Sequence, residues 1–130
     1  MGKCYDTMVS FKTLVLGAST NQKRYAYKTI SLLLKNKIEV IPMGIKPGFI
    51  EGLFIVRPFS FQKNIHTVSL YLSPALQEEY FDFIIDLKPQ RVIFNPGTEN
   101  LELAKKLNEF GIAYENSCSL VLLSTNQYKS

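Results

Sequence analysis

Short apolar runs alternate with amphipathic segments along most of this chain, and that alternation constrains its fold more than any other feature. The apolar runs lie at 13–16, 38–41, 66–72, 91–94 and 112–114. Short runs of this kind, bounded by turn residues, are typical of strands buried on both faces of a sheet. Segment 25–35 instead has helical spacing, with Ile30 and Leu33 on one face. The pattern therefore predicts an α/β domain with a parallel sheet.

The remaining segments complete this prediction. Helices are expected from Ser73 to Leu87, with Pro74 at the first helical position, and from Thr98 to Phe110. The stretch 43–61 is expected to be a long loop. The sequence thus predicts a three-layer Rossmann-like α/β fold whose five-stranded parallel sheet has the order 3-2-1-4-5. Ligands bind such sheets beyond the carboxyl ends of the strands, where the order reverses, which points to loops 17–24 and 95–100.

Length, charge and cysteine content narrow the class of protein. The 130 residues suit one domain, expected over 12–130 after an N-terminal extension at 1–11. The net charge of +4 is spread along the chain, with no basic run that would indicate nucleic-acid binding. No apolar run approaches the roughly 20 residues of a membrane span. We therefore expect a cytoplasmic protein that binds neither membrane nor nucleic acid, with Cys4 and Cys118 reduced.

The loop after the first strand is the clearest candidate for ligand binding. It reads Gly17-Ala18-Ser19-Thr20 and reaches Arg24 just before the helix. Backbone N–H groups and the helix dipole hold phosphates at this position, and small residues allow a close approach. The two hydroxyls and the Arg24 guanidinium would add hydrogen bonds. The loop lacks the G-x-G-x-x-G fingerprint, so an ordinary connection without a ligand is the alternative.

The end of the second strand carries a lysine where NAD-binding folds place an acidic residue. A carboxylate at this place bonds the ribose hydroxyls of NAD, and this sequence has none until Glu51. Lys46 would instead attract a phosphate on that ribose. This favours coenzyme A or NADP over NAD, with a solvated loop lysine as the alternative.

Two further strand ends bear polar candidates. Ser73 follows the third strand, and Asn95 begins the turn Asn-Pro-Gly-Thr after the fourth. Ser73 and Thr98 are also explained as helix caps, and asparagine is common in turns. A role in bonding a polar ligand therefore competes with a structural role at each position.

Candidates for catalysis are few. Cys118 is expected just past the fifth strand, whereas His66 is expected at the opposite, amino end of the third. A nucleophile and its base must lie within hydrogen-bond reach, so these two are not expected to act together. The cysteines and the histidine also lack metal-site spacing. The sequence therefore predicts neither a catalytic residue nor a metal site.

Several segments together carry a family resemblance. They are KTLVLGASTNQKRY at 12–25, Val-Ile-Pro at 40–42 with Lys46, SLYLSP at 69–74, VIFNPGTEN at 92–100 and CSLVLL at 118–123. They resemble the small stand-alone CoA-binding domain proteins, which are similar to the CoA-binding domain of succinyl-CoA synthetase. The resemblance covers roughly residues 12–128.

The resemblance implies a Rossmann fold with coenzyme A lying over the strand ends. It implies that Gly17, Ala18, Ser19 and Thr20 line the pyrophosphate, that Arg24 contacts phosphate, that Pro42, Met43 and Lys46 lie beside the adenosine, and that Leu72 and Ser73 flank the cofactor. The family usually reads Pro-Val-Asn-Pro-Lys after the second strand, and this chain reads Pro-Met-Gly-Ile-Lys. The phosphohistidine domain and grasp module of the synthetase are missing, so no ligase activity is implied.

The resulting hypothesis is a module that binds coenzyme A or an acyl-CoA without catalysis of its own. A small NADP- or NAD-dependent oxidoreductase is the alternative, and it would need a proton donor that the sequence does not reveal. A protein that has kept the fold and lost the ligand is a third reading. The sequence is compatible with a homo-oligomer or a partner subunit.

Overall fold

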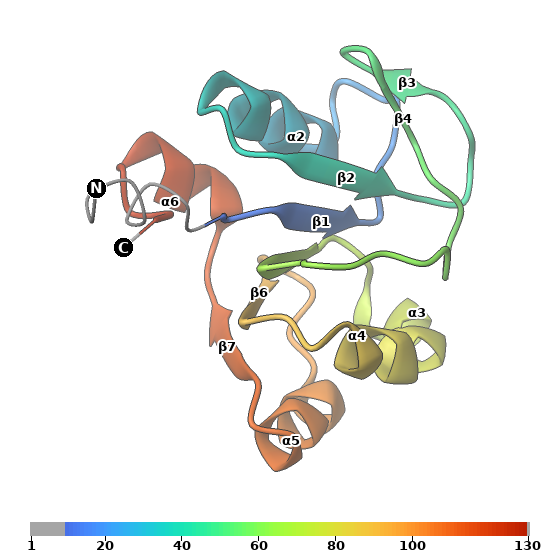
Figure 1. Ribbon diagram of the computed structural model, residues 1–130, viewed down its shortest axis with the longest axis vertical. Coiled ribbons are helices and arrows are strands. Elements are labelled where there is room, and N and C mark those ends of the chain that lie inside the picture. The colour runs from blue at the N-terminus through green and yellow to red at the C-terminus, as the bar shows by residue number, and fades with distance from the viewer. Residues whose placement is uncertain (1–9, 130) are drawn as a thin grey trace, which may run out of the picture.

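The computed structural model describes residues 10–129 and is organised around a parallel sheet in the order β2-β1-β5-β6-β7 (Figure 1). The strands are β1 (Thr13–Leu16), β2 (Val40–Met43), β5 (Thr67–Leu70), β6 (Arg91–Phe94) and β7 (Ala113–Asn116). All four neighbouring pairs are parallel. The expected fold class, a Rossmann-like α/β fold with a five-stranded parallel sheet, is confirmed.

Helices cover both faces of the sheet and make three layers (Figure 1). They are α2 (Tyr25–Lys35), α3 (Pro74–Gln77), the 3-10 turn η1 (Glu78–Tyr80), α4 (Phe81–Leu87), α5 (Leu101–Glu109) and α6 (Ser119–Ser124). Successive residues of β1 point to opposite faces: Leu14 packs in the core under α4 and α5, whereas Val15 packs in the core under α2 and α6. Burial on both faces explains why the strands read as continuous apolar runs.

The third strand of the sheet lies elsewhere than the order 3-2-1-4-5 would place it. That order puts segment 66–72 at the sheet edge beside β2, but β5 pairs with β1 on one side and with β6 on the other. The position beyond β2 is filled by the connecting loop, where Val56 makes a single parallel bridge to Met43. The order therefore reverses between β1 and β5, and not between the first strand and 91–94.

The second strand runs two residues further than its predicted end, through Pro42 to Met43. Proline lacks an N–H and is usually excluded from central strands. Here β2 is the outer strand of the five, and the Pro42 carbonyl accepts a hydrogen bond from Val56 N on the side away from β1 (2.8 Å). The backbone of Pro42 therefore faces away from β1, and its lack of an N–H removes no hydrogen bond between β1 and β2.

One predicted helix is found as expected, and the other two have changed boundaries. Helix α2 matches the expected span 25–35, but the helix expected over 73–87 is divided into α3, η1 and α4. The helix expected from Thr98 begins at Leu101, because Asn100 is the N-cap and accepts from Leu103 N at 3.2 Å. The Thr98 hydroxyl instead donates to the Asn95 carbonyl at 2.8 Å and closes the preceding turn.

The long connection at 43–61 contains a small antiparallel hairpin of β3 (Phe49–Ile50) and β4 (Leu53–Phe54). Ile50 and Ile55 are buried with the α2 side of the core, so this loop is packed against the domain. The expected extension at 1–11, including Cys4, falls almost wholly outside the described residues. No helix within 10–129 is long and apolar enough to cross a membrane.

Candidate functional site

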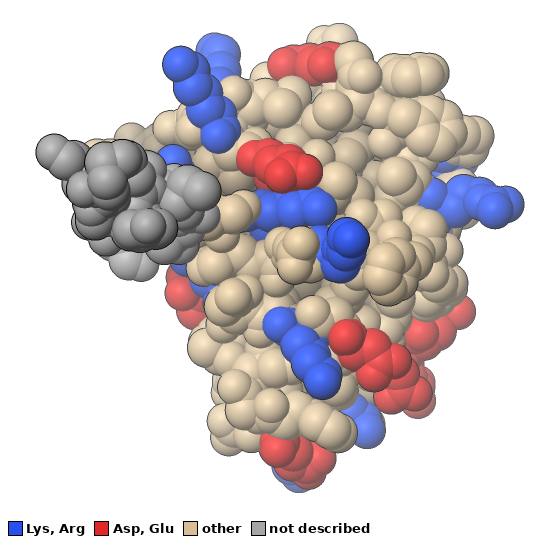
Figure 2. All heavy atoms as spheres, in the orientation of Figure 1, with Lys and Arg blue, Asp and Glu red and all other residues tan. Residues whose placement is uncertain are grey.

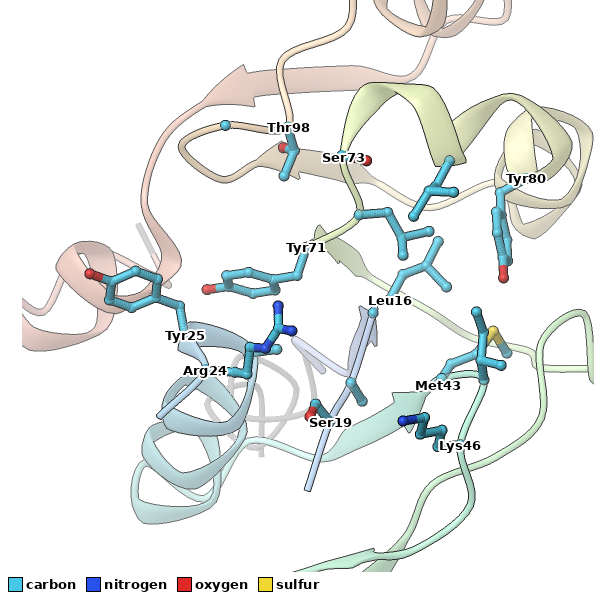
Figure 3. Close-up of a pocket in the computed structure, with 18 of the residues that line it drawn as sticks. Leu16, Ser19, Arg24, Tyr25, Met43, Lys46, Tyr71, Ser73, Tyr80 and Thr98 are labelled. Carbon is cyan, nitrogen blue, oxygen red and sulfur yellow. The ribbon is translucent and has the colours of Figure 1, made fainter. Parts of the chain in front are cut away.

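A cavity of about 610 Å³ opens at the carboxyl edge of the sheet (Figure 3). It is lined by residues 16–20 after β1, 24–26 at the start of α2, 43–46 after β2, 71–73 after β5 and 96–98 after β6, with Leu76 and Tyr80 from the following helical segment. We call it the carboxyl-edge cavity. It lies across the β1–β5 boundary, where the strand order reverses and where ligands of doubly wound sheets bind.

The structure brings most of the sequence-predicted site residues to this cavity. Gly17, Ala18, Ser19, Thr20, Arg24, Met43, Lys46, Leu72 and Ser73 all line it. Pro42 and Asn95 do not. Pro42 is buried within β2, and Asn95 is fully buried and is not among the residues that line the cavity.

Asn95 is a structural residue whose side chain joins three elements. Its amide nitrogen donates to Ser69 Oγ (2.9 Å) and to the Leu70 carbonyl (2.8 Å), both in β5. Its amide oxygen accepts from the backbone N–H of Ser119, the first residue of α6 (2.8 Å). All of its polar atoms are therefore occupied by the protein, and none faces the cavity.

The loop after β1 is held tightly between the ends of the neighbouring strands. The backbone N–H groups of Gly17 and Ala18 both donate to the Met43 carbonyl (2.9 Å each). Gly17 has φ +101°, and a Cβ there would lie 3.0 Å from the Tyr71 backbone. Gly44 is closer still, since its Cβ would lie 2.4 Å from the Ala18 carbonyl oxygen. Glycine is required at both positions for these loops to meet.

The first turn of α2 faces the cavity without a side-chain cap. Its N-cap residue is Arg24, which makes no capping hydrogen bond, and Tyr25 and Ala26 both line the cavity. The first N–H groups of a helix have no partner within the helix and carry partial positive charge. This end of the cavity is therefore suited to an anion.

The charges on the cavity wall have one sign. Among its lining residues, the charged side chains are those of Arg24 and Lys46. Within residues 10–129 the one ion pair joins Lys12 to Glu39, so neither cavity cation is neutralised by a carboxylate. The nearby Glu99 instead accepts a hydrogen bond from Gly97 N at 3.0 Å. On the face shown in Figure 2, basic and acidic side chains are interspersed, with no broad basic patch.

The cavity is also lined by three tyrosines that were not predicted from the sequence as site residues: Tyr25, Tyr71 and Tyr80. Tyr71 hydrogen-bonds Thr29 of α2 through their hydroxyls. Burial raises the pKa of Tyr71 to about 12 although this bond lowers it, so the phenol stays neutral. The position of Tyr71 at the end of the apolar run 66–72 was the available signal, since strand ends face the site.

Gln77 ties together two of the loops that form the cavity rim. Its side chain is fully buried, and its Nε2 donates to the carbonyls of Leu72 and Thr98 (2.8 Å each). Its Oε1 accepts from Asn100 Nδ2 at 3.1 Å. Gln77 thus fixes the loop after β5 against the loop after β6.

The two candidates for catalysis lie at opposite edges of the sheet. His66 directly precedes β5 at the amino edge, where its Nδ1 lies 2.7 Å from Thr67 Oγ1. Burial, aided by the Arg91 charge, lowers the pKa of His66. Cys118 is a free, half-buried thiol that follows β7 at the carboxyl edge. Among residues 10–129, no group of three or more metal-ligating side chains comes together.

The chain matches the model of the CoA binding domain family over residues 12–124. It is similar to the crystal structure of an uncharacterized protein, at 42% identity, covering 92% of this chain and 98% of that chain with a TM-score of 0.88. A hypothetical protein from Pyrococcus horikoshii OT3 is 26% identical, with 89% and 83% covered and a TM-score of 0.77. A Thermus thermophilus protein, at 18% identity, shares the fold over 96% and 95% of the two chains with a TM-score of 0.81.

No match was found among curated protein sequences. The family model nevertheless spans nearly all of the described residues, and it covers every loop that lines the carboxyl-edge cavity. This chain therefore belongs to the CoA binding domain family.

Proposed function

We propose that this protein binds coenzyme A or an acyl-CoA in the carboxyl-edge cavity, as a binding module without chemistry of its own. The observation that carries the proposal is an uncapped helix start beside two cations in a cavity whose lining contains no carboxylate. Coenzyme A presents a pyrophosphate and a separate ribose phosphate, so it offers two anionic groups to two positive ones. Membership of the CoA binding domain family supports the same ligand.

The charges suggest how the ligand lies. The pyrophosphate is proposed to lie against Ser19 and the first turn of α2, within reach of Arg24, where backbone N–H groups and the helix dipole favour it. The 3′-phosphate of the ribose then faces Lys46, after β2. The adenine enters the apolar side of the cavity next to Met43, and the pantetheine arm leaves over Tyr71 toward the loop after β6.

The proposal gives no catalytic role to any residue. The two candidates for a catalytic role, His66 and Cys118, lie at opposite edges of the sheet. Tyr71 and Tyr80 on the cavity wall are neutral phenols, since burial raises the pKa of both. Their hydroxyls are suited to hydrogen bonding and not to removing a proton near neutral pH.

The role of Lys46 is tested by comparing two ligands that differ only in the 3′-phosphate of the ribose. We expect coenzyme A to bind about tenfold more tightly than dephospho-CoA, because a charge-assisted hydrogen bond is worth about 1.5 kcal/mol or more. Lys46→Gln should remove most of this preference while leaving the affinity for dephospho-CoA unchanged. Isothermal titration calorimetry of both ligands with both proteins measures the four affinities.

Lys105→Gln is the matched control, since Lys105 is an exposed residue of α5 away from the cavity and the charge change is the same. It should behave like the unmodified protein. Equal affinities for the two ligands would remove the proposed role of Lys46. Failure of both ligands to bind would overturn the proposed function itself.

A further inference from the structure

Tyr80 differs from the buried Tyr128 and the half-buried Tyr71 in that its hydroxyl makes no hydrogen bond within the part of the protein that the structure describes. Tyr128 shares a hydrogen bond with Thr13 at 2.7 Å, and Tyr71 shares one with Thr29. Tyr80 is only 4% exposed, yet within residues 10–129 its hydroxyl makes no hydrogen bond. In that part of the chain, every side-chain polar atom sealed from solvent has a partner. The Tyr80 hydroxyl must therefore reach open space, which the cavity provides.

The ring of Tyr80 is held in place by aromatic neighbours. Phe59 stacks on it with centroids 4.6 Å apart and an angle of 18° between the rings. Phe83 in turn packs edge-on against Phe59 at 5.8 Å and 86°. Figure 3 shows the result: the Tyr80 hydroxyl is directed toward Met43 at one end of the cavity. Its direction is thus set without any ligand, which lowers the entropy cost of using it.

The surroundings of this hydroxyl are otherwise apolar. Leu16 and Met43, which line the cavity, belong with Tyr80 to one cluster of buried apolar residues, and Leu72 packs against that cluster. Burial raises the pKa of Tyr80, and the Glu79 carboxylate adds to this, so the group is a neutral donor and acceptor. A single neutral hydroxyl in an apolar recess fits an uncharged, flat, polar-edged group such as a nucleobase, and does not fit a phosphate.

We propose that the Tyr80 hydroxyl is a specificity-determining group that hydrogen-bonds the adenine base of the bound nucleotide. The inference rests on the proposed function, since it assigns the base to the end of the cavity beside Lys46. It predicts that loss of this hydroxyl weakens the binding of the nucleotide half of coenzyme A and leaves the binding of the pantetheine half unchanged. It further predicts that the hydroxyl contributes to ligand binding and not to folding.

The test uses the full chain, the variant Tyr80→Phe, and two fragments of coenzyme A: adenosine 3′,5′-bisphosphate and 4′-phosphopantetheine. We expect Tyr80→Phe to weaken the binding of coenzyme A and of adenosine 3′,5′-bisphosphate by the same factor, about three- to tenfold, the size of one hydrogen bond. Binding of 4′-phosphopantetheine should not change. Isothermal titration calorimetry gives the affinities.

Thermal unfolding separates binding from folding. Without ligand, Tyr80→Phe should keep the melting temperature of the unmodified protein, because no protein hydrogen bond is lost. Tyr71→Phe is the matched control: it loses the bond to Thr29 and should melt at a lower temperature.

The outcomes that would contradict the assignment of Tyr80 can be distinguished from those that would contradict the proposed function. If Tyr80→Phe leaves all three affinities unchanged, or weakens only 4′-phosphopantetheine, the assignment of the base to Tyr80 is wrong while the proposed function stands. A drop in the melting temperature of ligand-free Tyr80→Phe equal to that of Tyr71→Phe would show a structural role instead. If the unmodified protein binds none of the three ligands, the proposed function fails.

Discussion

Replacing Asn95 with leucine is expected to lower the free energy of unfolding by about 2–6 kcal/mol. Leucine is similar in size but leaves the Leu70 carbonyl and the Ser119 N–H buried without the partner that Asn95 supplies. Each unsatisfied buried group costs about 1–3 kcal/mol. Urea unfolding followed by circular dichroism measures the change.

Asn116→Leu is the control for this prediction, because Asn116 is an exposed residue at the end of β7. Its effect should stay within about 0.5 kcal/mol, as for most surface changes. If both substitutions cost the same, Asn95 is not the link between β5, β6 and α6. Of the two roles that the sequence left open for Asn95, the hydrogen bonds favour the structural one, since its side-chain polar atoms are all bonded to protein.

Gly44→Ala is expected to damage both stability and ligand binding. The new Cβ would lie 2.4 Å from the Ala18 carbonyl oxygen, so the loop after β1 must move. Overpacking of this kind costs about 1–3 kcal/mol of unfolding free energy. Because the displaced loop is the one proposed to hold the pyrophosphate, affinity for coenzyme A should fall about tenfold, equivalent to about 1.4 kcal/mol.

Gly52→Ala is the control that separates movement of the loop after β1 from a general loss of stability. A Cβ at Gly52 meets nothing within 4 Å, but φ is +89°, so alanine there is strained by about 1–2 kcal/mol. Both variants should therefore be less stable, and only Gly44→Ala should bind coenzyme A more weakly. Equal affinities in the two variants would contradict a role for the loop after β1 in holding the ligand.

The fold was largely predictable because its strands are buried on both faces. Apolar runs such as 91–94 and the helical spacing of 25–35 mark their elements directly, and both spans match the structure. The position of β5 was not predictable in the same way. The connection 44–66 is long enough to bring the next strand either beyond β2 or beside β1, and in the structure the connection itself lies beyond β2, with a single bridge from Val56 to Met43. Local periodicity carries no information about that choice.

The candidate site was predictable as far as it is made of strand ends. Segments 17–20 and 43–46 follow apolar runs, segment 71–73 spans the end of the run 66–72, and all three line the carboxyl-edge cavity. Tyr80 was not predicted as a site residue, because it does not follow a strand. It comes to line the cavity only when the segment after Ser73 folds into α3 and η1. In the sequence it is one of several aromatic residues, with Phe81 and Phe83, that suit a core or an oligomer surface equally well. Its open hydroxyl is visible only when the hydrogen bonds of the folded chain are known.

The central claim is that the carboxyl-edge cavity holds coenzyme A, and direct titration tests it. We expect coenzyme A to bind the full chain with a 1:1 stoichiometry and to raise its melting temperature, since a ligand that binds only the folded state stabilises it. NADPH, titrated in parallel, should bind more weakly by at least about tenfold. Tighter binding of NADPH than of coenzyme A, or heats of dilution alone for coenzyme A, would contradict the account.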